Sequence, residues 1–251
     1  MADGWPQVSV LLITYKRMDR ALLTLEGVRN HLVYPGPLHY HVADDGSGGD
    51  HIAQLVAECA RDPRAVSVTS TDAARAGVGV SMNLGQHVCW ERSDYILWLE
   101  DDWQLTAPFN LMPCVAVLRE CQDVGMVRLG YMQRGMTGTL EAGGGQLWWR
   151  LSWDSSDPYV FTGHAALRHK RFWDFNGDYP AGLTPGDTEG VFSDKVRRRR
   201  GPVMLWPGEV CIWGPFGHIG GVSLAGMPVG AAWDGGDTRQ TPTAGIGLRP
   251  Q

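Results

Sequence analysis

The sequence has no apolar stretch that approaches the roughly 20 residues needed to span a bilayer. Residues 1–6 lack the hydrophobic segment of a signal peptide, so we expect a cytoplasmic protein without an integral membrane segment. The five cysteines are scattered and include no Cys-x-x-Cys pair, which favours reduced, mostly buried thiols over a disulfide framework. A net charge of −5 excludes a nucleic-acid binder that works by overall charge alone, although local basic runs remain.

The chain is rich in hydrophobic residues, glycine and tryptophan. A hydrophobic content of 43% over 251 residues is enough for one large domain. The 33 glycines indicate many tight turns, and the 11 tryptophans suit stacking on flat ligands. The segment 235–251, rich in Gly, Thr and Pro, is expected to be a loose tail.

Short apolar runs alternate with amphipathic segments along the first hundred residues. The runs predict buried strands over 8–14, 39–43, 66–71 and 95–99. Between them we expect three helices, the first capped by Asp19, the second opened by Asp50 and the third over about 81–90. This order predicts an α/β fold, with a mostly parallel central sheet and helices on both faces.

The second half is less regular. Its pattern predicts a helix over 108–121, a strand over 125–131, a glycine-rich hairpin or flexible loop over 135–145, a strand over 159–163 and a helix over 189–200.

The fourth strand ends in three acids, Glu100, Asp101 and Asp102. Adjacent carboxylates at the end of a buried strand repel one another and lose hydration, so a cation should share their site. Oxygen ligands of this kind suit Mg²⁺ or Mn²⁺. The plainer alternative is a solvated acidic turn.

Polar residues also follow the other predicted strands. Thr14 and Tyr15 follow the first, and Asp44 and Asp45 follow the second. Because ligands bind beyond the carboxyl ends of the strands in such sheets, we expect these residues to line one binding site.

Several short segments, in this order over about 8–221, together resemble a family 2 glycosyltransferase with the GT-A fold. They are Val8 to Lys16, Ala43-Asp44-Asp45-Gly46-Ser47, Arg75-Ala76-Gly77 through Asn83, Leu99-Glu100-Asp101-Asp102, Thr162 to Leu167, and Asp187-Thr188-Glu189 ahead of 195–201. The resemblance implies a nucleotide-sugar-binding half over about 1–105 and an acceptor-binding half over about 106–234 of a single domain.

The resemblance implies a UDP-like donor. Tyr15 would stack on the base, Asp44 or Asp45 would accept from the base or ribose, and Arg75 would bind the diphosphate. Their alternatives are a core tyrosine, a turn-stabilising aspartate and a solvated arginine. The full set of predicted donor residues is Thr14, Tyr15, Arg17, Asp44, Asp45, Arg75, Asn83, Glu100 and Asp101.

The resemblance also implies a metal site for Mn²⁺ or Mg²⁺. Asp102 matches the last Asp of the family's Asp-x-Asp signature, and His218 matches a carboxyl-terminal histidine that often completes the site. Glu100 stands where the first Asp is usual, so it would contact the metal directly or through water. A lone histidine is otherwise most often a hydrogen-bonded structural residue.

The catalytic base of the family corresponds to Glu189, with Asp187 as the fallback, because Thr188-Glu189 replaces the usual Glu-Asp pair. The alternative for both is helix N-capping. Gly163, His164 and Trp149 are expected on the acceptor side.

The acceptor is either a saccharide, ranked first, or a hydroxylated base in DNA. The basic runs 168–171 and 195–200 would hold DNA phosphates, or else be solvated helix ends. Other classes are a nucleotidyltransferase, which would usually have a glycine-rich loop after the first strand, and a non-catalytic sugar- or nucleic-acid-binding module. No pattern in the sequence predicts an oligomeric state.

Overall fold

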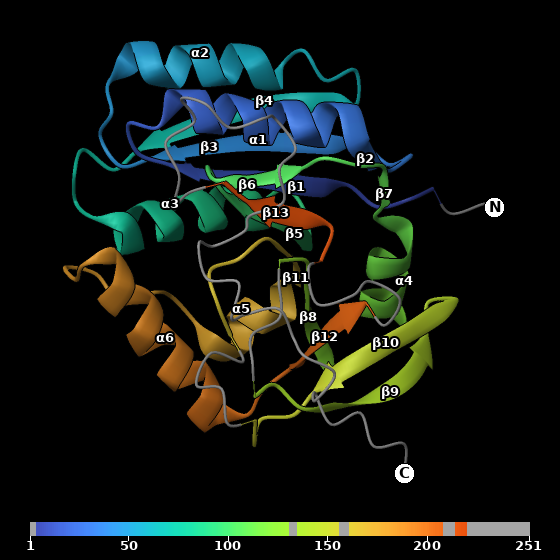
Figure 1. Cartoon of the computed structure of the whole chain (residues 1–251). Coiled ribbons are helices and arrows are strands. Elements are labelled where there is room, and N and C mark those ends of the chain that lie inside the picture. The colour runs from blue at the N-terminus through green and yellow to red at the C-terminus, as the bar shows by residue number, and fades with distance from the viewer. Residues whose placement is uncertain (1–3, 131–134, 156–160, 208–213, 220–251) are drawn as a thin grey trace.

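The computed structural model describes residues 4–130, 135–155, 161–207 and 214–219 (Figure 1). The predicted tail 235–251 and Cys211 lie outside these residues. The four described cysteines are free thiols, and Cys59, Cys89 and Cys114 are buried.

A nine-stranded sheet runs through the molecule in the order β4-β3-β1-β5-β11-β8-β12-β10-β9. In its first half β1 (Val8–Thr14) lies between β3 (Leu38–Asp44) and β5 (Tyr95–Glu100), parallel to both, and β4 (Ala65–Asp72) pairs in parallel with β3. β1 and β3 are buried throughout and β5 nearly so, because helices cover both of their faces, whereas the edge strand β4 has no buried residue.

The second half adds antiparallel pairings to the same sheet. β11 (Ala166–His169) runs antiparallel between β5 and β8 (Val124–Arg128), and β12 (Val203–Pro207) pairs in parallel with β8. The hairpin of β9 (Gly138–Gly143) and β10 (Gln146–Leu151) closes the far edge.

Shorter elements complete the fold. Two small sheets pair β2 (Leu32–Val33) with β7 (Phe109–Asn110) and β6 (Trp103–Leu105) with β13 (Phe216–His218). The helices are α1 (Met18–His31), α2 (Gly49–Cys59), α3 (Val78–Trp90), α4 (Met112–Glu120), α5 (Lys170–Asn176) and α6 (Pro185–Arg199).

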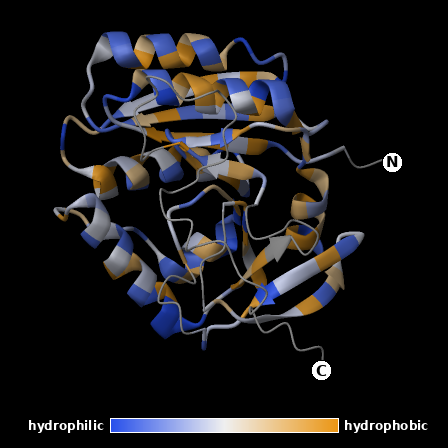
Figure 2. Cartoon of the chain, viewed as in Figure 1, coloured by the Kyte–Doolittle hydropathy of each residue, from blue (hydrophilic) through white to orange (hydrophobic). Residues whose placement is uncertain are grey.

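Side-chain alternation along β1 divides the core into two layers. Val10 and Leu12 join the cluster that contains Leu25 of α1, whereas Leu11 joins the cluster that contains Met82 of α3. Figure 2 shows the hydrophobic residues concentrated on the central strands and the helices carrying both kinds of residue. The predicted α/β fold with helices on both faces of a mostly parallel central sheet is confirmed.

Most predicted elements are found within a few residues of their predicted ends, and 135–145 belongs to a hairpin. Two details were wrong. Asp19 does not cap α1, because Arg17 holds the N-cap position and no side chain caps it. Of the strand predicted over 159–163, the described residues 161–163 are not in a strand.

Two histidines of β3 form a buried polar ladder with β4. His41 Nδ1 lies 2.7 Å from Thr69 Oγ1 and its Nε2 3.1 Å from Thr71 Oγ1, while His39 Nδ1 lies 2.7 Å from Ser67 Oγ. Burial lowers the pKa of His41 to about 4, with His39 lowering it further. His41 is therefore neutral in the folded protein at neutral pH.

This ladder predicts an acid-labile fold. Between its ordinary pKa of 6.5 and the folded value of about 4, His41 binds a proton more readily in the unfolded chain, so stability is lost as pH falls through this range. The substitution His41→Gln should shrink the difference in unfolding free energy between neutral pH and about pH 4.5 by up to about 2–3 kcal/mol. Urea unfolding at both pH values measures this, and an unchanged difference in the variant would contradict it.

Candidate active site

The three acids follow the last strand of the parallel half. The register pairs Ile13 with Glu100 and Thr14 with Asp44, so β1, β3 and β5 end side by side. Asp101 is 0% exposed and Asp102 is 5% exposed. The alternative of a solvated acidic turn is therefore wrong.

The cation that these acids require is the guanidinium of Arg17. Its Nη2 pairs with Asp101 Oδ1, and its Nη1 lies 2.7 Å from Asp102 Oδ2. Thr14 Oγ1 donates to Asp101 Oδ2 at 3.0 Å, and the backbone N–H of Tyr15 donates to the same oxygen at 3.3 Å. These ion pairs and hydrogen bonds connect the end of β1 and the residues after it to the residues that follow β5.

The three carboxyl groups differ in their proton affinity. Burial raises the pKa of Glu100 well above its ordinary value, with Asp102 and Glu189 adding to the effect, which favours a protonated Glu100 at neutral pH. Burial also raises the pKa of Asp101 to about 6, against the opposing charge of Arg17. For Asp102 burial acts in the same direction, but the contacts with His218 and Arg17 outweigh it and lower the pKa.

Two candidate metal ligands lie together. His218 Nε2 is 3.5 Å from Asp102 Oδ2, and Asp102 Oδ1 is buried without a hydrogen-bond partner among the described residues. This pair fits a Mg²⁺ or Mn²⁺ ion that takes its other ligands from phosphate and water. No group of three or more His, Cys, Asp or Glu side chains in the described ranges could hold a metal. A contact of Glu100 with the metal, direct or through water, stays a prediction.

The loop after β3 uses its first aspartate to hold itself in place. Asp44 accepts from the backbone N–H groups of Gly46 and Ser47 at 2.8 and 2.6 Å, which is the turn-stabilising role. The half-buried Asp45 accepts from the N–H of Gly77 at 3.0 Å. This hydrogen bond connects the loop after β3 to the loop before α3 at the same edge of the sheet.

His51 belongs to the same edge and was not predicted. Its Nε2 lies 3.2 Å from Thr14 Oγ1 and 3.8 Å from Asp44 Oδ1. The one cue in the sequence for this location is that His51 lies in the first turn of α2, directly after the polar loop.

The other predicted donor residues fall into two groups. Tyr15 and Arg75 are exposed on loops at the same edge, and Arg75, with φ of 65°, covers Gly46. Asn83 is instead used structurally, since its Nδ2 donates to the carbonyl of Tyr179 and its Oδ1 accepts from the N–H of Tyr179, both at 2.9 Å. It fastens the Tyr179 loop to α3.

Glu189, one turn into α6, lies next to the acids. Its Oε1 accepts from the N–H of Gly163 at 2.6 Å. A Cβ atom at Gly163 would lie 2.7 Å from Glu100 Oε1 and 3.6 Å from Glu189 Oε1, so a side chain at this position would require the Glu100 carboxyl group to shift. The structure thus brings Glu100, Gly163 and Glu189 together.

Asp187 takes part in the helix cap. Its backbone N–H donates to the N-cap Thr184 Oγ1 at 3.3 Å, and Thr184 Oγ1 lies 2.6 Å from Asp187 Oδ2. The capping alternative therefore applies to Asp187, whereas Glu189 takes its hydrogen bond from another segment.

Trp103, which was not predicted as a site residue, lies beneath the site between two histidine rings. Its ring centroid is 4.6 Å from that of His164 and 5.1 Å from that of His218. Trp149, predicted on the acceptor side, lies on β10, four strands from β5, or about 19 Å at the usual strand spacing. The structure therefore does not bring Trp149 to the acids.

The basic run 168–171 does not form a cationic surface. Arg168 is 3% exposed, its guanidinium lies 3.7 Å from the ring centroid of Trp98, and it donates to Tyr179 Oη at 2.8 Å. Arg171 donates to the carbonyl of Val124 at 2.7 Å. The prediction that this run contacts an acceptor is wrong.

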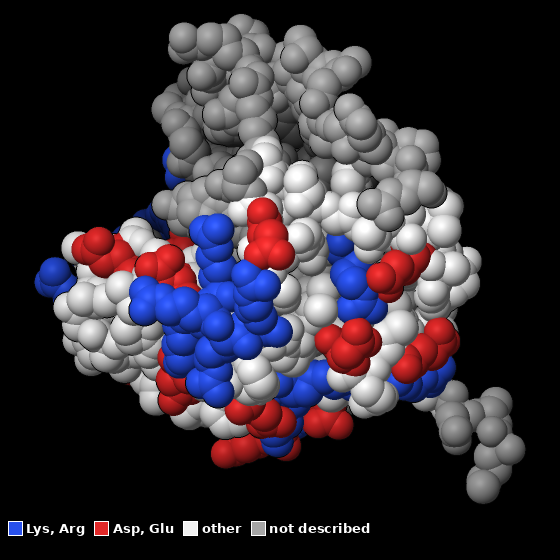
Figure 3. All heavy atoms as spheres, turned by 90° about the horizontal axis from the view of Figure 1, so that it is seen from below, with Lys and Arg blue, Asp and Glu red and all other residues white. Residues whose placement is uncertain are grey.

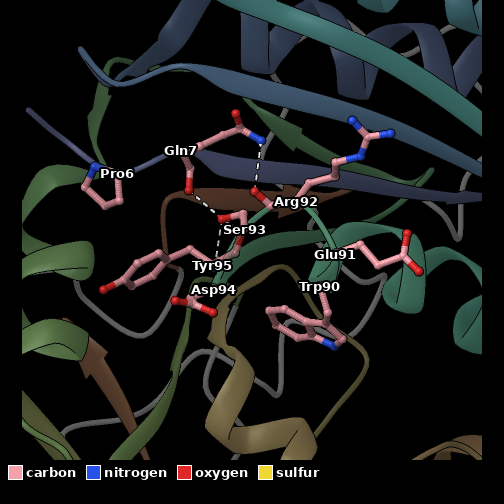
Figure 4. A pocket seen from close by; sticks show the side chains of 8 residues that line it. All are labelled: Pro6, Gln7, Trp90, Glu91, Arg92, Ser93, Asp94 and Tyr95. Carbon is pink, nitrogen blue, oxygen red and sulfur yellow. Dashed lines mark hydrogen bonds between the residues drawn. The ribbon is translucent and has the colours of Figure 1, made fainter.

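A hollow of about 300 Å³ lies at the opposite end of the sheet (Figure 4). It is lined by Gln7 before β1 and by Tyr95 at the start of β5, with Arg92 and Ser93 between. Because β1 and β5 are parallel, the acids lie at the other ends of these strands, so this hollow is separate from them.

The fold and site define a GT-A glycosyltransferase. Three solved structures are similar: Staphylococcus aureus TarS 1-349 in complex with UDP, GalNAc-T7 with UDP, GalNAc and Mn²⁺, and the mannosyltransferase PcManGT from Pyrobaculum calidifontis with GDP-Man and Mn²⁺. Their TM-scores are 0.60, 0.59 and 0.56 at 14%, 15% and 16% identity. The matches cover 81%, 86% and 83% of this chain and 58%, 44% and 58% of theirs.

The family is established by sequence. Residues 9–143, more than half of the chain, match the model of glycosyl transferase family 2. The chain therefore belongs to glycosyl transferase family 2. No curated protein matches the sequence significantly. Among the described residues, no helix has the length and apolar character to cross a bilayer.

The ion pairs of Arg17 lead to a stability prediction. Arg17→Met leaves the buried Asp101 carboxylate without its cation and should cost about 1–3 kcal/mol, less than for a fully buried pair because Arg17 itself is partly exposed. The matched control Arg61→Met breaks an exposed pair with Glu58 and should cost at most about 1 kcal/mol. Urea unfolding compares the two, and equal losses would contradict the role of Arg17.

Proposed function

We propose that the protein is an inverting glycosyltransferase that moves a sugar from a nucleotide-diphosphate donor, a UDP-sugar, to an acceptor hydroxyl. The observation that carries this proposal is the position of Glu189, held by the N–H of Gly163 beside Glu100 at the edge where β1 and β5 end. Family membership supports sugar transfer over nucleotidyl transfer and over a binding module without activity.

The donor would lie over the segments after β1, β3 and β5, within residues 1–105. Tyr15, half exposed, offers its ring to the base, and Asp45 offers a carboxylate to the base or ribose. The exposed Arg75 offers a guanidinium to the diphosphate. UDP and GDP-Man in the similar structures support a donor of this class.

A divalent cation would be held by Asp102 and His218, the pair with a buried, unpartnered carboxylate oxygen among the described residues. When bound, such an ion offsets the negative charge of the leaving diphosphate. Mn²⁺ in GalNAc-T7 and PcManGT supports this assignment. Arg17, which contacts Asp101 and Asp102, adds a fixed positive charge at the same place.

Glu189 would act as the general base. Its carboxylate takes the proton of the acceptor hydroxyl as that oxygen forms a bond to the anomeric carbon and the bond to the diphosphate breaks on the opposite face. Gly163 and His164, in the acceptor-binding half over about 106–234, would line the acceptor side.

The base assignment predicts a matched pair of variants. Glu189→Gln keeps the shape but removes the proton acceptor, so sugar transfer should fall by about 10²–10⁴-fold. Asp187→Asn, two residues earlier in the helix cap, should retain most of the activity. Initial rates with a radiolabelled UDP-sugar and an acceptor mixture compare the two. Similar rates for Glu189→Gln and the unchanged protein would reject Glu189 as the base.

The metal assignment predicts a ligand-dependent thermal shift. UDP with Mn²⁺ at about 100 times its Kd should stabilise the protein by about 2.7 kcal/mol and raise its Tm by about 5–10 °C. Asp102→Asn should abolish most of this shift, whereas Asp50→Asn, in the first turn of α2, should retain it. A shift of equal size in the Asp102 variant, or one that is independent of Mn²⁺, would contradict the site.

A further inference from the structure

The second basic run forms a cationic patch at the carboxyl end of α6. The patch consists of Lys195 and residues 197–200, with Arg199 as the last residue of the helix. Arg198 and Arg200 have side chains that are 80% and 60% exposed. Figure 3 shows Lys and Arg side chains gathered in such a patch on the face seen from below, on a chain whose net charge is −5.

Neighbouring acids neutralise the patch only weakly. Arg198 lies 3.3 Å from Asp194 and Arg200 2.5 Å from Asp154, and all four side chains are at least 60% exposed. Exposed ion pairs of this kind contribute about 0–1 kcal/mol and exchange readily with other anions.

Stabilisation of the helix dipole does not by itself explain the number of positive charges in the patch. Cations in the last turn complement the helix dipole, and Arg197, Arg198 and Arg199 already fill that turn. Arg200 adds a fourth guanidinium at a position with φ of 48°, in the left-handed region where glycine is the usual residue. The arginine is present at a conformational cost that a glycine would avoid.

The patch and the base lie on one helix. Glu189 lies one turn into α6, and Arg199 follows ten residues later, about 15 Å along the axis at 1.5 Å per residue. An anion bound by the patch would therefore lie about 15 Å from Glu189 along α6. A polymer with a phosphate every 3.4 Å or so along one strand would place four or five phosphates over this length.

We propose that the patch of Lys195 and residues 197–200 docks the sugar-phosphate backbone of a nucleic acid whose hydroxylated base is the acceptor at Glu189. This inference rests on the proposed function and specifies its acceptor. Arginine forks match phosphate oxygens, and four of the five cations are arginines. Phe175, 38% exposed with the Arg199 guanidinium 4.8 Å from its ring centroid, offers a surface for stacking a base.

The carboxylates around the patch favour a strand over a membrane. A flat anionic bilayer that approached Arg198 and Arg200 would also meet the exposed Asp194 and Asp154. A strand with discrete phosphates contacts the guanidinium groups between these acids. A neutral saccharide makes no use of the charge.

The test is binding of labelled single- and double-stranded DNA oligonucleotides, followed by fluorescence anisotropy between about 50 and 200 mM salt. The charge-reversal variant Arg198→Glu/Arg200→Glu should weaken binding by at least about tenfold and lower the slope of log K against log salt by about 1.4–1.8. Arg61→Glu/Arg92→Glu makes the same charge change on exposed arginines elsewhere and should bind like the unchanged protein. If the charge-reversal variant fails to fold, Arg198→Gln/Arg200→Gln makes the same comparison.

Three outcomes would overturn the proposal: no salt-dependent binding of either oligonucleotide, equal binding by the patch and control variants, or binding to anionic phospholipid vesicles in place of DNA. Release of UDP from a UDP-sugar by the unchanged protein without acceptor tests the proposed function separately. If the unchanged protein releases UDP but binds neither oligonucleotide, the nucleic-acid acceptor alone is refuted and the proposed function stands.

Discussion

The site depends on the carboxylate of Asp101, which is closed to solvent at the end of β5. A buried charge is tolerated only with a partner, and Arg17 supplies it while Thr14 and the Tyr15 N–H donate to the same group. The backbone carbonyl of Asp101 also accepts from Thr24 of α1 at 3.1 Å. This single residue therefore fixes the segment after β1 against the segment after β5, and with it the place of Asp102.

The surroundings of the neighbouring acids shift the pKa values of their carboxyl groups in different directions. For Asp102 the contacts with His218 and Arg17 outweigh burial and lower the pKa, whereas burial raises the pKa of Glu100 well above its ordinary value. Glu189 accepts a hydrogen bond from the N–H of Gly163, which in turn lies close to Glu100. Under the proposed function, Asp102 would lie beside the leaving diphosphate and Glu189 beside the acceptor hydroxyl.

Local pattern in the sequence was sufficient for most of the first half of the fold. The strand 8–14 was predicted to the residue, because a continuous apolar run must be buried on both faces. The acids, Thr14 and Tyr15 were predicted at one edge because parallel strands end together, whereas Arg17 was predicted as a donor residue only from the family resemblance. The local sequence pattern could not predict the order of the strands in the second half of the sheet. Arg168 looks like a surface residue in sequence, yet β11 inserts between β5 and β8 and buries it. His51 and Trp103 enter the site through contacts across the sheet, which no spacing in the chain encodes.

The central claim is that Arg75 and a cation held by Asp102 and His218 bind the diphosphate of a nucleotide sugar beside Glu189. A crystal structure of the protein soaked with UDP and Mn²⁺ tests it most directly. The account predicts the base against Tyr15 and a metal ion joining Asp102 and His218 to the phosphates. A nucleotide bound elsewhere, with Asp102 and His218 contacting neither metal nor phosphate, would contradict it.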